Sequence, residues 1–150
     1  GPLKGKGVYL AQWRRDAEDR LAEIYAQMEE LAQRTRVVEG RRFSLQVHKL
    51  RNAKQLRWRF GSAAEGVASR HATWERIAQL LPEFNQVLAN WYESLNELAQ
   101  VLNAQEQVLR YECKTVQRLT TGAVTKIRVR AFEGEVGHGV FGNRPSSSRI

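Results

Sequence analysis

The chain has 150 residues, of which 24 are Lys or Arg and 16 are Asp or Glu, so its formal net charge at pH 7 is +8. This length suits one folded domain with a core of its own. The single cysteine, Cys113, excludes a disulfide within the chain. The sequence contains no run of 18 apolar residues, so no membrane span is predicted. We therefore expect a cytoplasmic protein without a membrane partner.

The positive charge is concentrated in one stretch. Between Arg34 and Arg59 there are nine basic residues and one acidic residue, Glu39, a net of +8 that equals the charge of the whole chain. The remaining 15 basic and 15 acidic residues balance. A basic block of this kind is typical of a surface that binds a polyanion. The alternative is that Lys and Arg protect an exposed strand against edge-to-edge pairing.

The chain begins with a glycine- and lysine-rich segment, Gly1–Gly7, which is predicted to be a flexible lead-in. From Val8 to about Arg36 apolar residues recur at spacings of three and four, which predicts a long amphipathic helix. The apolar stripe is Leu10, Trp13, Ala17, Leu21, Ile24, Met28 and Leu31. Such a stripe needs a partner helix to cover it.

The segment Arg41–Gly61 predicts a basic β-hairpin with a loop at residues 51–54. Its apolar residues stand at alternate positions, as in two strands with one buried face: Phe43, Leu45, Val47, Leu56, Trp58 and Phe60. Alternation places Trp58 on the buried face. The alternative is an exposed Trp58 that stacks on single-stranded bases.

On this interpretation the polar face and the tip of the hairpin present basic side chains to the phosphates of a nucleic acid. Arginine suits this role because its planar fork contacts phosphate bidentately. A two-stranded ribbon also fits the major groove of B-form DNA, so DNA is preferred over RNA as the partner. The candidate phosphate-binding residues are Arg41, Arg42, Lys49, Arg51, Lys54, Arg57 and Arg59.

Two further helices are predicted after the hairpin. The loop Gly61–Ser69 ends in a plausible helix cap, so a short helix is expected at Arg70–Leu81. Pro82 should interrupt it and begin a longer helix that runs to about Leu119. The apolar stripe of the longer helix is Phe84, Leu88, Trp91, Leu95, Leu98, Leu102, Gln105 and Leu109. The polar Gln105 either sets the helix register or marks a fraying seam.

The longer helix exceeds the first in length, so part of its apolar seam is expected to lack a partner within the chain. A second copy of the chain or a partner protein could cover it through helix 82–119. The candidate partner-binding residues are Leu95, Leu98, Leu102 and Leu109. Beyond the stop at Thr120–Gly122, weak alternation over Ala123–Phe132 predicts a third strand beside the hairpin, and Gly134–Ile150 is expected to be a disordered tail.

No motif for chemistry appears. The three histidines, His48, His71 and His138, lie on separate segments without metal-ligand spacing. Cys113 lies in a helical pattern, where a buried small apolar residue is the simplest interpretation. No glycine-rich loop opens a helix after a strand, so no nucleotide fingerprint is present. We therefore expect no enzyme activity, cofactor, metal or small-molecule ligand.

Three short segments carry a resemblance. The start Lys4–Gly7, the helix end Leu31–Arg34 and the LRWR segment Leu56–Arg59 resemble a family of small uncharacterised bacterial proteins carried on integrating conjugative elements and plasmids. The likeness implies a mobile-element context, in which accessory roles in DNA maintenance, transfer or recombination are common. It implies no catalytic residues.

These observations lead to one expected fold and two functional hypotheses. The fold is α+β, with two long antiparallel coiled-coil-like helices joined through a basic β-hairpin and a short extra helix, in one domain over residues 1–133. The first hypothesis is a non-enzymatic nucleic-acid-binding accessory protein that acts as a dimer. The second is a protein–protein adaptor that binds its partner through the long helices.

Overall fold

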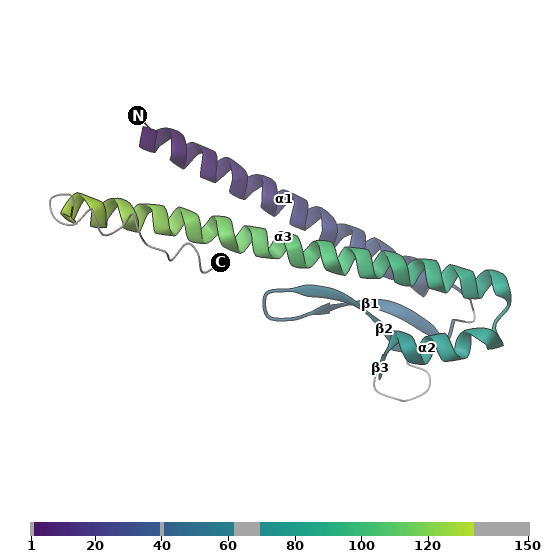
Figure 1. Ribbon diagram of the computed structural model, residues 1–150. Coiled ribbons are helices and arrows are strands. Elements are labelled where there is room, and N and C mark those ends of the chain that lie inside the picture. Colours follow the sequence, from purple (N-terminus) through teal and green to yellow (C-terminus); the bar gives the residue numbers. More distant parts are fainter. Residues whose placement is uncertain (1, 40, 62–69, 134–150) are drawn as a thin grey trace. The chain divides into compact units, whose positions relative to one another are not determined.

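The computed structural model of the chain describes residues 2–39, 41–61 and 70–133. Its elements, in chain order, are α1 (Pro2–Arg36), β1 (Phe43–Lys49), β2 (Lys54–Phe60), β3 (Arg70–Ala72), α2 (Trp74–Leu80), the short 3-10 helix η2 (Leu81–Glu83) and α3 (Gln86–Glu133) (Figure 1). Long helices, a short helix and an antiparallel sheet confirm the predicted α+β class. The predicted tail, Gly134–Ile150, lies outside the described residues.

The chain groups into two compact units. The larger unit is Arg15–Cys113, and the smaller combines Gly1–Arg14 with Lys114–Ile150. In the smaller unit Val116 is buried, and the Thr120 hydroxyl donates to the Val116 carbonyl at 2.9 Å. No helix in the described ranges is both long and apolar enough to cross a membrane.

The larger unit contains the sheet, whose strand order is β1-β2-β3 with antiparallel pairs throughout. In the β1–β2 hairpin Leu45 pairs with Trp58 and Lys49 pairs with Lys54, and a turn over residues 50–53 joins the strands. Side chains alternate between faces along a strand, so one face carries the apolar residues of the hairpin. Trp58 is only 4% exposed, which confirms its predicted place on the buried face.

The third strand is not the predicted one. Residues 123–132 continue α3 as helix to Glu133, because the weak alternation there has no proline and Gly122 alone costs a helix only about 1 kcal/mol. Instead β3 pairs with the far end of β2, with Ala72 opposite Trp58. The segment Arg70–Ala72 was predicted as the start of a helix.

The helix boundaries also differ from the prediction. α1 already begins at Pro2, where a flexible lead-in was expected, and proline is tolerated in a first turn. α2 begins at Trp74, because the Thr73 side chain caps it by accepting the Arg76 N–H at 3.2 Å. Pro82 lies in η2, and α3 begins at Gln86 after Asn85, whose side chain accepts the Leu88 N–H at 2.8 Å.

The core of the larger unit lies between the apolar face of the sheet and the helices. It is made of Ile24, Met28 and Leu31 from α1, Phe43, Leu45, Leu56 and Trp58 from the hairpin, and Tyr92, Leu95, Ala99 and Leu102 from α3. The ring of Tyr92 lies 5.1 Å from that of Phe43 and 5.8 Å from that of Trp58, measured between centroids. The sheet therefore packs its aromatic residues directly against α3.

Within the larger unit α1 and α3 run antiparallel. Arg20 pairs with Glu112 at 2.8 Å, and further along α1 the Tyr25 hydroxyl meets Glu106 at 2.9 Å. The contact position on α3 thus moves backward as α1 advances, which requires opposite directions. The predicted stripe of α1 is confirmed at Ala17, Ile24, Met28 and Leu31, all of which are buried.

The buried stripe of α3 is rotated from the predicted one. Tyr92, Ala99 and Glu106 are buried, whereas Leu98 is 46% exposed and Gln105 is exposed. The sequence of α3 carries two adjoining stripes at heptad spacing, and apolarity alone favours the one with Leu98. The other stripe is the one buried against the sheet, because backbone groups of the sheet need polar hydrogen-bond partners from α3.

Candidate nucleic-acid interface

The position of the hairpin is set by polar side chains of α3. Strand β3 covers only the end of β2, so the backbone of Lys54 and Leu56 lacks a strand partner on that side. The Asn103 side chain accepts the Leu56 N–H at 2.8 Å and donates to the Leu56 carbonyl at 3.1 Å. The Glu106 carboxylate accepts the Lys54 N–H at 3.2 Å. α3 thereby completes the hydrogen bonding of the β2 edge.

The opposite edge of the sheet is tied to α1. The Leu45 N–H of β1 donates to the Thr35 hydroxyl at 2.9 Å, and this hydroxyl donates to the Ala32 carbonyl at 2.7 Å. Thr35 is fully buried. Because buried backbone groups need hydrogen-bond partners, these contacts fix both edges of the hairpin against the helices.

Glu106 is fully buried and is the centre of a polar cluster. Its carboxylate accepts hydrogen bonds from the Tyr25 hydroxyl at 2.9 Å, from Arg110 Nε at 2.9 Å and from the Lys54 backbone. A buried carboxylate is tolerated only when it is paired in this way. The hydrogen bond to Glu106 raises the pKa of the Arg110 guanidinium. The cluster thus anchors the Lys54 end of β2 to α1 and α3.

The same cluster changes the ionisation of Tyr25. Burial, and then the hydrogen bond to Glu106, raise the pKa of Tyr25 to about 12. An unfolded tyrosine has a pKa near about 10, so the folded state holds the phenol proton more tightly. The resulting stabilisation is fully present below about pH 10 and is lost as the pH rises through about 12.

We therefore expect stability to fall more steeply between pH 10 and 12 in the wild type than in Tyr25→Phe, which has no proton to lose. Urea unfolding at a series of alkaline pH values measures this difference. An absorbance titration of both proteins should assign the highest-pH phenol to Tyr25. Equal pH dependence in the two proteins would contradict the inferred burial and contact with Glu106.

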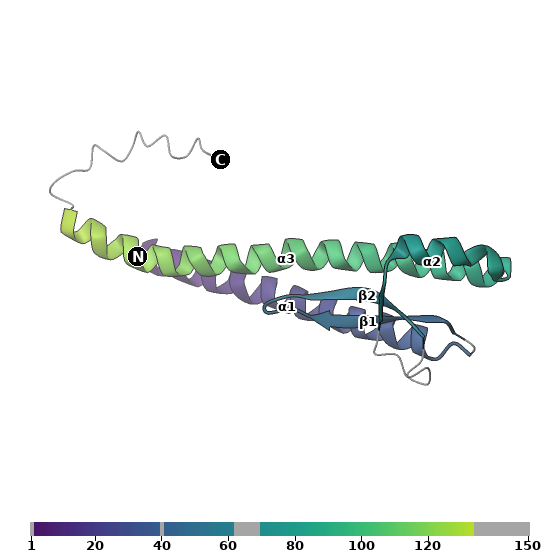
Figure 2. The same ribbon diagram turned by 90° about the horizontal axis from the view of Figure 1, so that it is seen from below.

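Apart from its edges, the sheet presents an open face. In Figures 1 and 2 the hairpin lies beneath α1 and α3, and no described helix covers its other side. By alternation from the buried residues, this outer face consists of Ser44, Gln46 and His48 of β1, Gln55, Arg57 and Arg59 of β2, and His71 of β3. Every one of these side chains is polar, and none is acidic.

Two arginines are the charged centre of the outer face. Arg59 lies opposite Ser44 on one side and His71 on the other, and its guanidinium donates to the side-chain oxygen of Gln46. Arg57 lies opposite Gln46, and its side chain forms no hydrogen bond or ion pair with the described residues. Both guanidinium groups thus remain free of acidic partners within that part of the chain.

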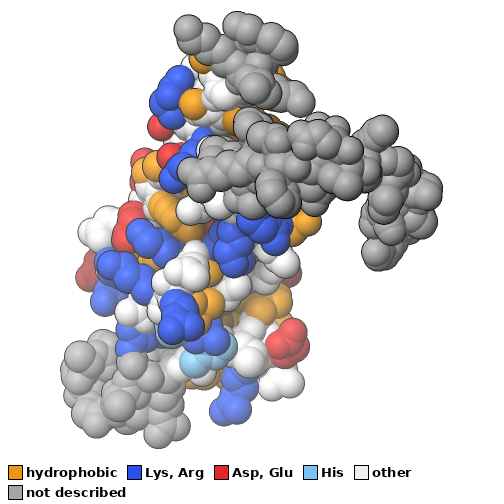
Figure 3. All heavy atoms as spheres, turned by 90° about the vertical axis from the view of Figure 1, so that its left-hand side faces the viewer, with side chains coloured by type: hydrophobic (Ala, Val, Ile, Leu, Met, Phe, Trp, Pro, Cys, Tyr) orange, Lys and Arg blue, Asp and Glu red, His pale blue; other side chains and the backbone are white. Residues whose placement is uncertain are grey.

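The hairpin tip adds further positive charge. Lys49 and Arg51 are exposed, and the register places Lys49 directly opposite Lys54. Like charges in this position repel. The repulsion is reduced because the Lys54 ammonium lies over the Tyr25 ring, 4.7 Å from its centroid. Figure 3 views the molecule from the side toward which the tip points, and Lys and Arg side chains gather there with few acidic ones among them.

The seven predicted phosphate-binding residues therefore divide into groups. Lys49, Arg51, Arg57 and Arg59 belong to the tip and the outer face. Lys54 is directed to Tyr25 on the helix side. At the base of the hairpin, Arg42 pairs with Glu83 at 3.0 Å and lies over the Phe84 ring, while Arg41 donates to the Arg36 carbonyl at 2.6 Å.

Sequence reasoning missed part of the outer face. Gln46 was visible from the alternation of β1, but its contact with Arg59 depends on the strand register. His71 was missed because its segment was predicted to be helical, whereas β3 places it beside Arg59. The outer-face histidines, His48 and His71, belong to no cluster of three or more metal-ligand side chains among the described residues. His138 lies outside those residues.

The predicted partner-binding leucines of α3 need correction. Leu95 and Leu102 are 2% and 8% exposed and Leu109 is half-buried, so the core of the chain itself covers them. Only Leu98 is exposed, at 46%. The expected uncovered seam is wrong at Leu95 and Leu102, because the sheet occupies the space that the longer helix was thought to leave open.

Comparison of the chain with protein-family models, with curated proteins and with solved structures found no match.

Proposed function

We propose that the protein binds nucleic acid through the outer face of the sheet and the hairpin tip. The observation that carries the proposal is that Arg57 and Arg59 stand on a sheet face without an acidic side chain, and that Lys49 and Arg51 are exposed at the tip of the same hairpin. This arrangement concentrates positive potential on a side of the strands that no described helix covers. A polyanion is the partner whose charge complements it.

The chemistry of the face favours phosphate contacts over base stacking. The aromatic residues of the hairpin, Phe43, Trp58 and Phe60, are on the core side, and no aromatic ring other than the two histidines stands on the outer face. Binding should therefore be sensitive to salt and weakly sequence-specific. Duplex DNA is the proposed partner, because a two-stranded ribbon fits its major groove, whereas the major groove of A-form RNA is too narrow.

A salt series with short labelled duplexes tests the proposal. If Lys49, Arg51, Arg57 and Arg59 each neutralise one phosphate, log affinity should fall with log salt with a slope of about −3.6, roughly a hundredfold loss between 50 and 200 mM. Reversal of both arginines, Arg57→Glu with Arg59→Glu, should abolish binding. The neutral pair Arg57→Gln with Arg59→Gln should reduce the slope by about 2.

The control makes the same change in net charge elsewhere. Arg34 and Arg118 are exposed and belong to the long helices rather than to the strands, so Arg34→Glu with Arg118→Glu should retain most of the affinity. Circular dichroism of each variant checks the fold. Equal loss in the two reversal pairs would reduce binding to unspecific charge attraction, and unchanged affinity in the Arg57 and Arg59 pair would refute the proposal.

We also propose an accessory role in a mobile genetic element, and this proposal rests on the resemblance of the three short segments. The alternative function is that of an adaptor, in which the same outer face docks an acidic protein surface. The salt series separates the two: an adaptor would show no affinity for duplex, single-stranded DNA or RNA even at low salt.

A further inference from the structure

Two side chains on the outer face of the sheet can change their charge near neutral pH. His48 of β1 is half-buried and His71 of β3 is exposed. In Figure 3 histidine atoms (pale blue) lie among Lys and Arg side chains (blue). Histidine is the side chain whose ordinary pKa, about 6.5, lies between pH 5 and 8. The outer face therefore carries its two arginine charges at pH 8 and gains up to two more when the imidazole rings are protonated.

His71 belongs to a row of three polar side chains that crosses the sheet. The strand register places Ser44 of β1 opposite Arg59 of β2, and it places Arg59 opposite His71 of β3. The Cβ atoms of directly opposite residues are about 5 Å apart. The hydrogen bond from the Arg59 guanidinium to Gln46 occupies only part of its fork of N–H donors. The remaining donors can share one phosphate with a protonated His71.

His48 stands nearer to the tip of the hairpin. It lies opposite the uncharged Gln55, which makes Arg57 its diagonal neighbour on the outer face, at a Cβ separation of about 7–8 Å. Both side chains can span that separation, so a phosphate that Arg57 contacts is also within reach of His48. Each histidine thus stands beside an arginine that has no acidic partner among the described residues.

The charged groups on the neighbouring elements are directed elsewhere. α2 carries Glu75 in its first turn, four residues after His71. This helix packs on the core side of the sheet, where the Trp74 ring lies 5.8 Å from that of Trp58. At the base of the hairpin the Glu83 carboxylate is paired with Arg42, and Glu106 is buried beneath β2 in its own cluster. In the described part of the chain, the titratable and charged side chains on the outer face are therefore the two histidines and the two arginines.

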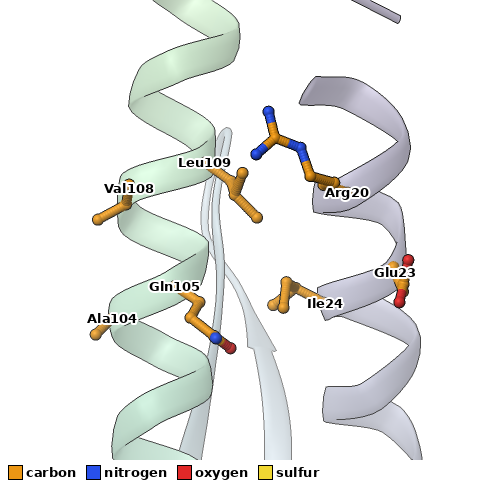
Figure 4. Close-up of a pocket in the computed structure, with 7 residues that line it drawn as sticks. All are labelled: Arg20, Glu23, Ile24, Ala104, Gln105, Val108 and Leu109. Carbon is orange, nitrogen blue, oxygen red and sulfur yellow. The ribbon is translucent and has the colours of Figure 1, made fainter. Parts of the chain in front are cut away.

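The groove between α1 and α3 has a different arrangement of charge. Its volume is about 460 Å³, and its charged lining residues are Arg20 and Glu23 of α1 (Figure 4). Arg20 is already paired with Glu112 at 2.8 Å. A polyanion would meet a carboxylate beside the cation there, and none of the described residues that line the groove is a histidine. A gain of charge near neutral pH is therefore expected on the outer face of the sheet and not in this groove.

We infer that His48 and His71 make the binding of DNA depend on pH, because each becomes an additional phosphate ligand when it is protonated. The inference rests on the proposed function, since it concerns the same outer face. A phosphate stabilises the charged form of a neighbouring histidine, so proton uptake and DNA binding favour each other. Affinity should accordingly be constant above about pH 8 and should rise as the pH falls through about 6.5.

The affinity of the full chain for a short labelled duplex, measured from pH 8.0 to pH 5.5 at constant ionic strength, tests the inference. If each protonated histidine neutralises one phosphate, the salt slope should steepen from about −3.6 at pH 8.0 to about −5.4 at pH 5.5. At 100 mM salt the two added contacts should increase the affinity about tenfold or more. An affinity and a salt slope that stay constant over this range would overturn the inference.

The double variant His48→Gln with His71→Gln separates these two rings from every other titrating group. Glutamine is neutral throughout the range and keeps a polar side chain, so affinity at pH 8.0 should equal that of the wild type while the gain at pH 5.5 is lost. Circular dichroism checks the fold. The matched control is His138→Gln, at the histidine outside the described residues, and it should keep the full gain. A gain that survives in the double variant, or that disappears in the control, would contradict the inference.

The same measurements distinguish this inference from the proposed function. Salt-dependent binding at pH 8.0 without a gain at pH 5.5 would overturn the pH dependence alone, whereas no binding at either pH would overturn both. Calorimetric titration at pH 6.5 in two buffers with different heats of ionisation counts the protons taken up on binding. The wild type should take up protons and the double variant should take up none. Binding of the wild type without proton uptake would contradict the role of the two histidines.

Discussion

Replacement of Glu106 by alanine is expected to lower the free energy of unfolding by about 3–5 kcal/mol. The substitution removes the acceptor for the Tyr25 hydroxyl and for the backbone N–H of Lys54, and it leaves the Arg110 guanidinium without its carboxylate. Buried donors without acceptors carry most of this cost.

Chemical denaturation followed by circular dichroism measures the effect of Glu106→Ala. The neighbouring Gln107 is exposed, so Gln107→Ala should change the stability by less than about 0.5 kcal/mol. Glu106→Gln keeps an oxygen that can accept the Lys54 N–H. The stability that it loses should therefore lie between the losses caused by Glu106→Ala and by Gln107→Ala. A cost of Glu106→Ala no larger than that of Gln107→Ala would show that the cluster does not anchor the hairpin.

Replacement of Trp58 by alanine is expected to cost about 3–5 kcal/mol, the usual range for a buried aromatic residue. The Trp58 ring lies 5.8 Å from the rings of both Trp74 and Tyr92, and its indole N–H donates to Asn96 at 3.0 Å. The side chain thus joins β2 to α2 and to α3. Its loss should loosen the attachment of the sheet to both helices.

Trp58→Phe separates packing from any direct role in binding. It keeps an aromatic ring but loses the hydrogen bond to Asn96, so we expect a stability loss of about 1–2 kcal/mol. Because Trp58 faces the core, the affinity of this variant for duplex and single-stranded DNA should equal that of the wild type. Affinity for single strands that falls tenfold in a folded Trp58→Phe would favour base stacking over the phosphate mode.

Sequence periodicity predicted the parts of the fold that one local rule controls. Strict alternation around Leu45 and Trp58 predicted the hairpin and its buried face, because a strand exposes every second side chain to the same side. The three-four spacing from Ala17 to Leu31 predicted the buried face of α1. The position of the excess charge likewise indicated which element to examine for a polyanion site.

The same rules failed where two local solutions were similar in energy. α3 has two adjoining stripes, and the buried one contains Glu106, which apolarity would never select. Residues 123–132 alternate weakly, yet they extend a helix that is already formed, because extension needs only one residue to be fixed for each new hydrogen bond. β3 is three residues long and gains its strand geometry only by pairing with β2.

The sequence by itself determined the α+β class, the hairpin with Trp58 on its inner side, and the concentration of positive charge between Arg34 and Arg59. These properties follow from composition and from the periodicity of single elements. Tertiary structure alone decided which cations face outward, which stripe of α3 is buried and which is left exposed. Those outcomes depend on backbone groups of β1 and β2 that need partners from α1 and α3, and such long-range hydrogen bonds leave no periodic trace in the chain.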